Sequence, residues 1–158
     1  MKHIVLALVA FALVGCGTAK TIVLEAPIEK VAYAAVAIVS DNPTVEVPEE
    51  VTQIFEGELR KALFDEGPFS SGEGLKLLYT FVQHDEGDRF ERWLWGGLGN
   101  AGEASITVMV KYTNASGEEL AKTQVEGRID SGFFGGSIDS AIKEAARDVA
   151  TYTIDNFE

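Results

Sequence analysis

The strongest constraint on the fold is the alternation of polar and apolar side chains over residues 105–113. Every second residue there is large and apolar, which puts four such side chains on one face of a strand: Ile106, Val108, Val110 and Tyr112. Residues 114–118 (NASGE) predict a tight turn, and residues 120–129 predict a second strand in which Ala121, Thr123, Val125 and Ile129 face inwards. The other face of this antiparallel hairpin is mostly polar, so we expect helices to cover the sheet on one side only.

The remaining periodic segments predict two further strands and two helices. Residues 31–39 (VAYAAVAIV) form a short continuous apolar run, which is typical of a strand buried on both faces. A helix is predicted from Pro48, where two glutamates follow the proline, to the Gly67-Pro68 pair. Residues 74–83 predict a strand and residues 137–157 a final helix. The expected fold is a two-layer α/β sandwich (α+β) of order βαβββα, with a four-stranded mixed sheet and both helices on one face.

The N-terminal residues resemble the leader of a bacterial lipoprotein. Lys2 and His3 precede an unbroken apolar run over residues 4–14, which has the length of a signal-peptide core and is too short to span a bilayer. The run ends in LVGC, which resembles a lipobox, and the thiol of Cys16 would accept a diacylglyceryl group as a stable thioether. The alternative is an ordinary secreted protein with a chance cysteine.

This leader divides the chain into three expected parts. We predict a signal peptide over residues 1–15, a lipidated cysteine and tether over residues 16–30, and a single periplasmic α/β domain over residues 31–158. Because Cys16 is the only cysteine, no internal disulfide can form. Gly17 stands where an aspartate retains enterobacterial lipoproteins in the inner membrane, so the resemblance implies the outer membrane, with the domain facing the periplasm.

The charge balance restricts the classes of partner. The chain carries 25 acidic and 13 basic residues, a formal net charge of −12 at pH 7. Such an excess disfavours nucleic-acid binding, which requires cations to neutralise phosphates, and it also disfavours polybasic attraction to anionic lipid headgroups. We therefore expect no nucleic-acid partner, and we expect membrane attachment through lipid or an apolar surface.

The short motifs do not supply a catalytic or cofactor site. Residues 97–102 (GLGNAG) match the dinucleotide-binding pattern, but a strand follows where a helix N-terminus is required. A charged group after the second predicted strand could hold a divalent ion, although a solvated turn is the preferred interpretation: His84, Asp85, Glu86 and Asp88. His84 is the only histidine after the leader, and no serine-hydrolase elbow occurs. We expect no enzyme activity and no cofactor.

Two glycine-rich segments bring aromatic residues to one end of the predicted sheet. Residues 92–102 (RWLWGGLGNAG) precede the third strand and residues 131–136 (SGFFGG) follow the fourth, so both adjoin the hairpin end opposite Gly117. Large apolar side chains on such loops suit a contact surface, for which we predict Trp93, Trp95, Leu98, Phe133 and Phe134. The alternative is that these side chains fold back over the end of the core.

The spacing of apolar and glycine-rich segments resembles a family of bacterial lipoproteins with a domain of unknown function, DUF 4410. The shared features span residues 28–157 and comprise the apolar run at 31–39, VPEE at 47–50, GGLG at 96–99, GEELA at 117–121, and Gly132 with Gly135-Gly136. More distantly, the layout is similar to the periplasmic α/β domains of curli-secretion and peptidoglycan-synthase-activating lipoproteins, which are assembly and regulatory proteins. The resemblance implies no catalytic residues, and Cys16 is the only position whose role it carries over.

These observations predict a membrane-anchored cell-envelope lipoprotein. Its domain would be a non-enzymatic module that binds another envelope protein or assembles with copies of itself. A second hypothesis is a periplasmic binding module for a small ligand or divalent ion, and a third is a periplasmic enzyme. An exposed apolar patch favours the first hypothesis, whereas titrating groups clustered in a pocket would favour the third.

Overall fold

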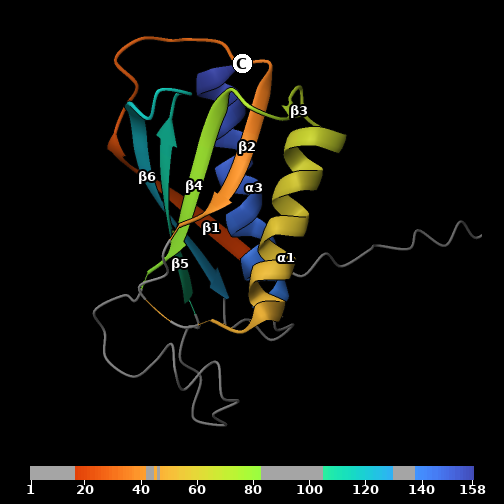
Figure 1. Ribbon diagram of the computed structural model, residues 1–158. Coiled ribbons are helices and arrows are strands. Elements are labelled where there is room, and N and C mark those ends of the chain that lie inside the picture. The colour runs from red at the N-terminus through yellow and green to blue at the C-terminus, as the bar shows by residue number, and fades with distance from the viewer. Residues whose placement is uncertain (1–16, 42–44, 46, 83–104, 130–137) are drawn as a thin grey trace, which may run out of the picture.

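A computed structural model of the chain describes residues 17–41, 45, 47–82, 105–129 and 138–158, and it is a mixed α/β structure (Figure 1). The elements in chain order are β1 (Gly17–Glu25), β2 (Ala35–Ser40), α1 (Glu49–Arg60), a π-helical turn η1 (Lys61–Asp65), β3 (Ser70–Ser71), β4 (Leu75–Phe81), β5 (Ser105–Thr113), β6 (Glu119–Ile129) and α3 (Ile138–Phe157). The described strands form one open six-stranded sheet in the order β1-β6-β5-β4-β2-β3.

The sheet is mixed, as the sequence predicts. Strands β1, β6, β5 and β4 are antiparallel to one another in that order, whereas β2 runs parallel to both β4 and β3. The hairpin of β5 and β6 pairs Val108 with Val125 and Tyr112 with Ala121, so the two apolar rows predicted from the sequence share one face. Gly117 in the connecting turn has φ of 86°, a conformation that glycine adopts without steric cost.

Both long helices lie on the same face of the sheet (Figure 1). The Phe55 ring of α1 packs 5.1 Å from the Tyr79 ring of β4, measured between ring centroids. Thr21 of β1 donates a hydrogen bond of 3.1 Å to Asp148 of α3. Through the strand register, Thr21 and Tyr79 belong to the same face, so the two helices cover this face, and among the described residues no helix lies on the opposite one, which we call the open face.

The core fills the space between the helices and the covered face. On β4 every second residue is buried, from Leu75 to Phe81, and the same alternation continues across the sheet. The largest fully buried side chains are Tyr79, Tyr112, Phe55, Phe157, Leu59, Leu63, Leu75 and Leu77. This burial pattern confirms the prediction that the two helices cover one face.

One glycine sets how closely α3 approaches the sheet. Gly127 of β6 lies so near the first turns of α3 that a Cβ atom there would collide with the carbonyl oxygen of Ala141. A side chain at this position would also press on the Ile106 side chain, at 3.0 Å from its Cγ2. The glycine therefore permits a helix–strand contact that any other residue would push apart.

The sheet has two strands more than predicted. Residues 17–25 were expected to be part of a tether, but they form β1, the edge strand paired with β6 from Gly17 to Glu25. The other extra strand is β3, a two-residue segment beside β2. Both are edge strands that pair with partners distant in sequence, and such pairing leaves little local signal.

The first predicted strand is shorter than its apolar run and is not buried on both faces. It begins at Ala35 instead of residue 31 and extends to Ser40. Within it only Val36 is fully buried, and Val39 is 40% exposed on the open face. The prediction of two-sided burial was wrong because the helices cover only one face, and β3 is too short to enclose β2.

Candidate functional site

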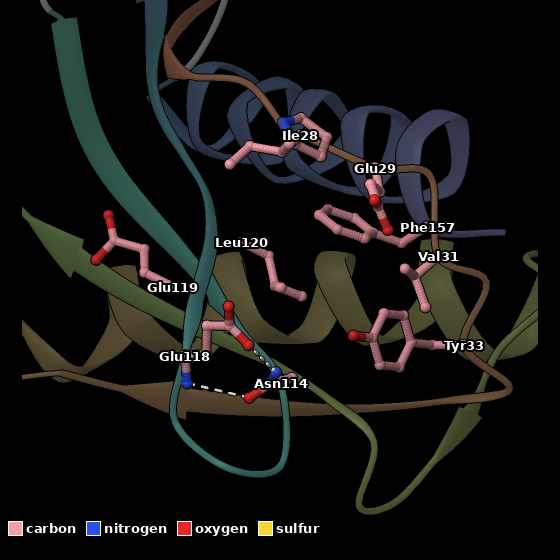
Figure 2. A pocket seen from close by; sticks show the side chains of 10 residues that line it. Ile28, Glu29, Val31, Tyr33, Asn114, Glu118, Glu119, Leu120 and Phe157 are labelled. Carbon is pink, nitrogen blue, oxygen red and sulfur yellow. Dashed lines mark hydrogen bonds between the residues drawn. The ribbon is translucent and has the colours of Figure 1, made fainter.

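A hollow lies at the end of the sheet where β5 turns into β6 (Figure 2). It has a volume of about 510 Å³, and we call it the turn-end groove. Three parts of the chain form it: the connection between β1 and β2, the β5–β6 turn with the start of β6, and the last turn of α3. Its lining residues are Pro27, Ile28, Glu29, Val31, Tyr33, Asn114, Glu118, Glu119, Leu120 and Phe157.

A network of hydrogen bonds around Asn114 holds the turn side of the groove. The Asn114 side-chain oxygen accepts from the backbone N–H groups of Ser116 and Glu118, each at 3.0 Å, and from the Ser116 hydroxyl at 2.6 Å. The Asn114 amide nitrogen donates to Glu118 Oε2 at 2.9 Å (Figure 2). One asparagine thus fixes both the turn and the orientation of an acidic side chain on the rim.

The opposite side of the groove is held against the end of α3. The backbone N–H of Tyr33 donates to the carbonyl oxygen of Phe157 at 2.8 Å. The two rings also meet edge to face, with centroids 6.2 Å apart and an interplanar angle of 63°. Tyr33 therefore fastens the β1–β2 connection to the helix by one backbone bond and one aromatic contact.

The floor of the groove continues into the core. Phe157 is 1% exposed and stacks on Tyr112, with ring centroids 5.1 Å apart. Burial raises the pKa of the Tyr112 hydroxyl well above its usual range, so this ring stays neutral at physiological pH. An apolar, uncharged floor favours an apolar group of a ligand or partner.

The rim combines exposed apolar side chains with carboxylates. Ile28 is 98% exposed and Val31 is 44% exposed, and both belong to the β1–β2 connection. Three glutamates also line the groove, namely Glu29, Glu118 and Glu119. Lys111 approaches Glu119 at 3.9 Å from outside, but none of the ten lining residues is basic. The groove therefore suits a group that is apolar in part and positively charged in part.

A smaller hollow lies between β1 and α3. It has a volume of about 180 Å³ and is lined by Thr21, Asp148, Thr151, Tyr152 and Asp155. Asp148 already accepts the Thr21 hydroxyl hydrogen bond. Within the described ranges, no three histidine, cysteine, aspartate or glutamate side chains come together as a metal site would require.

The residues predicted from the sequence as functional all lie outside the described residues. They are the lipidation site Cys16, the contact surface of Trp93, Trp95, Leu98, Phe133 and Phe134, and the charged group His84, Asp85, Glu86 and Asp88. None of the helices in the described part of the chain combines the length and apolar character needed to cross a bilayer.

Residues 40–131 match the model of a protein family described as Domain of unknown function (DUF4410). The chain belongs to this family. The matched residues include the Asn114 turn and the start of β6, whereas the β1–β2 connection and Phe157 lie outside them. The match confirms the DUF 4410 part of the resemblance inferred from the sequence, over residues 40–131 of the 28–157 expected.

Two solved structures of PelC from Paraburkholderia phytofirmans, both dodecamers, are similar to this DUF4410 chain. One, a variant PelC, shares 16% sequence identity with a TM-score of 0.49, and the match covers 88% of this chain and 98% of that chain. The other shares 14% identity with the same TM-score and the same coverage. No curated protein matches the sequence.

Sequence reasoning missed the turn-end groove because its lining comes from three distant parts of the chain. The β5–β6 turn itself was predicted, including Gly117, but the turn has no local signal for binding. The usable signal was in the β1–β2 connection, where Ile28 and Val31 flank the charged pair Glu29-Lys30 in a stretch without regular structure. Exposed apolar residues outside helices and strands indicate a contact surface more often than a core.

Proposed function

We propose that this DUF4410 member is a lipid-anchored cell-envelope lipoprotein whose domain binds a segment of another protein in the turn-end groove. The anchor part of the proposal rests on the leader, in which an apolar run of signal-peptide length ends in the LVGC sequence at Cys16. Gly17 after the cysteine supports the outer membrane, with the domain in the periplasm. We propose a role in assembly or regulation because the sequence layout resembles that of curli-secretion and peptidoglycan-synthase-activating lipoproteins.

One observation carries the binding part of the proposal: Ile28 and Val31 are exposed directly beside a buried aromatic floor and an acidic rim. Water-exposed branched aliphatic side chains cost free energy that contact with a partner recovers, at about 25 cal/mol per Å² of apolar area. The three glutamates would pair with lysine or arginine of that partner, which raises the association rate and selects the orientation. The expected partner segment therefore presents an apolar side chain next to basic ones.

The volume of the groove supports a second candidate, a small amphiphilic cation. A hollow of about 510 Å³ falls within the usual range of about 300–1,000 Å³ for small-molecule sites. The groove is formed by an exposed connection and a turn, which suits a protein segment better than an enclosed ligand. We therefore place the protein segment first.

Site-specific photo-crosslinking in living cells tests the binding proposal. A photoreactive phenylalanine analogue replaces Val31 in one strain and Val39, which has similar exposure on the open face, in the control strain. The proposal expects a discrete adduct of defined mass from position 31 and none from position 39. It also expects the adduct to disappear when Glu29 and Glu118 are both replaced by lysine, because the acidic rim would then repel a basic partner.

Two outcomes of this experiment contradict the binding proposal. One is the same adducts from positions 31 and 39, which would indicate non-specific contact. The other is an adduct that persists after the double charge reversal, which would remove the role of the rim. An adduct with a small molecule instead of a protein would favour the second candidate.

The anchor is tested separately. A Cys16→Ala variant should lose labelling by fatty-acid analogues and accumulate as a longer, unprocessed precursor. A variant that is processed normally and still fractionates with membranes would contradict the anchor, whatever the result for the groove.

A further inference from the structure

We infer that the anchored domain stands on the membrane at the end of the sheet where β1 begins, so that the turn-end groove is held at the opposite end, away from the bilayer. This orientation rests on the proposed lipid anchor at Cys16. In this orientation the end of the sheet where β1 begins faces the lipid surface, and the turn-end groove is held at a fixed distance from that surface.

The sequence position of β1 makes the connection to the lipid very short. Gly17, the residue after Cys16, is already paired with Ile129 of β6. Consecutive Cα atoms are about 3.8 Å apart across a trans peptide bond, so the acylated residue lies no farther than that from the sheet. An anchor of this kind has no free tether, and the expected tether segment is itself part of the sheet.

The edge strand is fixed in place by more than its backbone pairing. Thr21 donates a hydrogen bond of 3.1 Å to Asp148 on α3. The backbone pairs from Gly17↔Ile129 to Val23↔Thr123 hold β1 along β6. To lengthen the connection, β1 would have to leave β6, which would break these backbone pairs and the Thr21–Asp148 hydrogen bond and would remove Ala19 from the core against which it packs.

The strand register shows which parts of the molecule share the membrane end. Besides Gly17 and Ile129, the pair Ser105↔Arg128 lies there, so β5 begins at this end. Strand β4 ends farther in, at the level of Thr21, because Phe81 pairs with Val108 and Val108 with Val125. Helix α3 also starts near this end. The Thr21–Asp148 hydrogen bond joins a point about 13 Å from the start of β1 to a point about 15 Å from the start of α3, so the two elements begin at a similar level. The C-terminus lies at the other end, where β2 begins (Figure 1).

The same lengths place the groove. Strand β6 has 11 residues, which at about 3.3 Å per residue span about 36 Å. Helix α3 has 20 residues, which at 1.5 Å each span about 30 Å, and its last residue is Phe157 on the groove floor. The groove would therefore open roughly 30 Å from the lipid surface, pointing towards proteins of the periplasm.

Charge does not produce this orientation. Glu49 and Glu50 at the start of α1 and Asp139 at the start of α3 are exposed acids at or near the membrane end. Anionic headgroups would repel them weakly. The orientation therefore depends on the short covalent connection, which predicts that an inserted flexible linker abolishes it.

The experiment uses the full lipoprotein purified from membranes, with the lipid on Cys16 verified by mass spectrometry. Because that thiol is acylated, one introduced cysteine is the only free thiol for a fluorophore. Asp139→Cys reports on the membrane end and Ala115→Cys on the turn end, and both positions are exposed. The proteins are reconstituted into vesicles of phosphatidylethanolamine and phosphatidylglycerol that contain a lipid with a nitroxide headgroup, which quenches only nearby fluorophores.

We expect strong quenching at position 139 and none at position 115 relative to vesicles without nitroxide. Insertion of a Gly-Ser linker of about 20 residues between Cys16 and Gly17, with a root-mean-square length of about 25 Å, should make the two positions nearly equal. Equal quenching without the linker, or a difference that the linker leaves unchanged, would overturn the inferred orientation while the anchor stands. Absence of the lipid mass on Cys16 would instead refute the proposed anchor, and the orientation with it.

Discussion

Tyr112 and Lys111 are neighbours on β5, yet Tyr112 is fully buried beneath α3 whereas the Lys111 side chain is 39% exposed on the opposite face. Tyr112 stacks on Phe157 and lies 5.4 Å from the Tyr152 ring, measured between centroids. Lys111 lies directly opposite Lys122 on β6, and its ion pair with Glu119 is long, at 3.9 Å. The two faces of the same strands therefore differ in burial and in the interactions that they make.

The covered face supplies the stability, and the open face maintains solubility. Apolar area removed from water stabilises the fold in proportion to that area, whereas like charges on neighbouring strands contribute nothing or slightly oppose pairing. The chain, with a net charge of −12, tolerates the facing pair Lys111 and Lys122, because exposed charges are screened by solvent. Substitutions on the two faces should therefore differ several-fold in their effect.

The largest expected effect is from Tyr112→Ala compared with Lys111→Ala. Truncating a buried large aromatic residue costs about 3–5 kcal/mol of unfolding free energy, through lost burial and the cavity that remains. The adjacent lysine change should stay within about 0.5 kcal/mol. Urea unfolding of both variants, followed by far-UV circular dichroism, measures the difference. Comparable losses for the two variants would mean that the open face is covered in solution.

A second pair compares a crowded glycine with an open one. Gly127→Ala places a Cβ against the carbonyl oxygen of Ala141 and forces α3 away from β6, which should cost about 1–3 kcal/mol. Gly57→Ala is the matched control, since no heavy atom lies within 4 Å of its added Cβ in α1. Alanine in an exposed helix interior should stabilise the protein by about 0.5–1 kcal/mol. The two changes should thus shift the urea midpoint in opposite directions, and a shift in the same direction would disprove the close helix–strand contact.

These comparisons show why some elements are predictable from sequence. The hairpin was predicted almost to the residue, because its alternation of apolar and polar side chains and its turn chemistry are local and agree with each other. The final helix was equally well predicted, since its apolar stripe continues over 20 residues. The family resemblance also came from such local spacing.

The missed features depend on contacts between distant residues. Strand β1 pairs with residues more than 95 positions away, and only its Thr21-Ile22-Val23 run gave a local strand signal. The two-sided burial expected for residues 31–39 failed for the same reason, because an apolar run does not show how many layers will cover it. The turn-end groove combines three segments that only the folded sheet brings together.

The smallest expected effect is on the pH dependence of stability, and it arises from Tyr112 on the covered face. Burial raises the pKa of Tyr112, so its hydroxyl stays protonated in the folded protein while the same group ionises near pH 10 in the unfolded chain. The sign follows from this difference: the contribution of Tyr112 to stability is complete below about pH 10 and is lost as the pH rises above that value.

At pH 10.5 the loss from this one tyrosine should be about 1 kcal/mol relative to pH 8, since the unfolded state is then favoured by ionisation. The Tyr112→Phe variant keeps the ring and its stacking on Phe157 but has no ionisable group. It removes the 3.3 Å hydrogen bond with Thr153, whose hydroxyl still has the Val149 carbonyl oxygen at 2.7 Å as a partner. Urea midpoints of wild type and variant at both pH values should therefore show a smaller loss in the variant. An equal loss in both proteins would mean that Tyr112 reaches solvent, and with it that α3 does not seal the covered face.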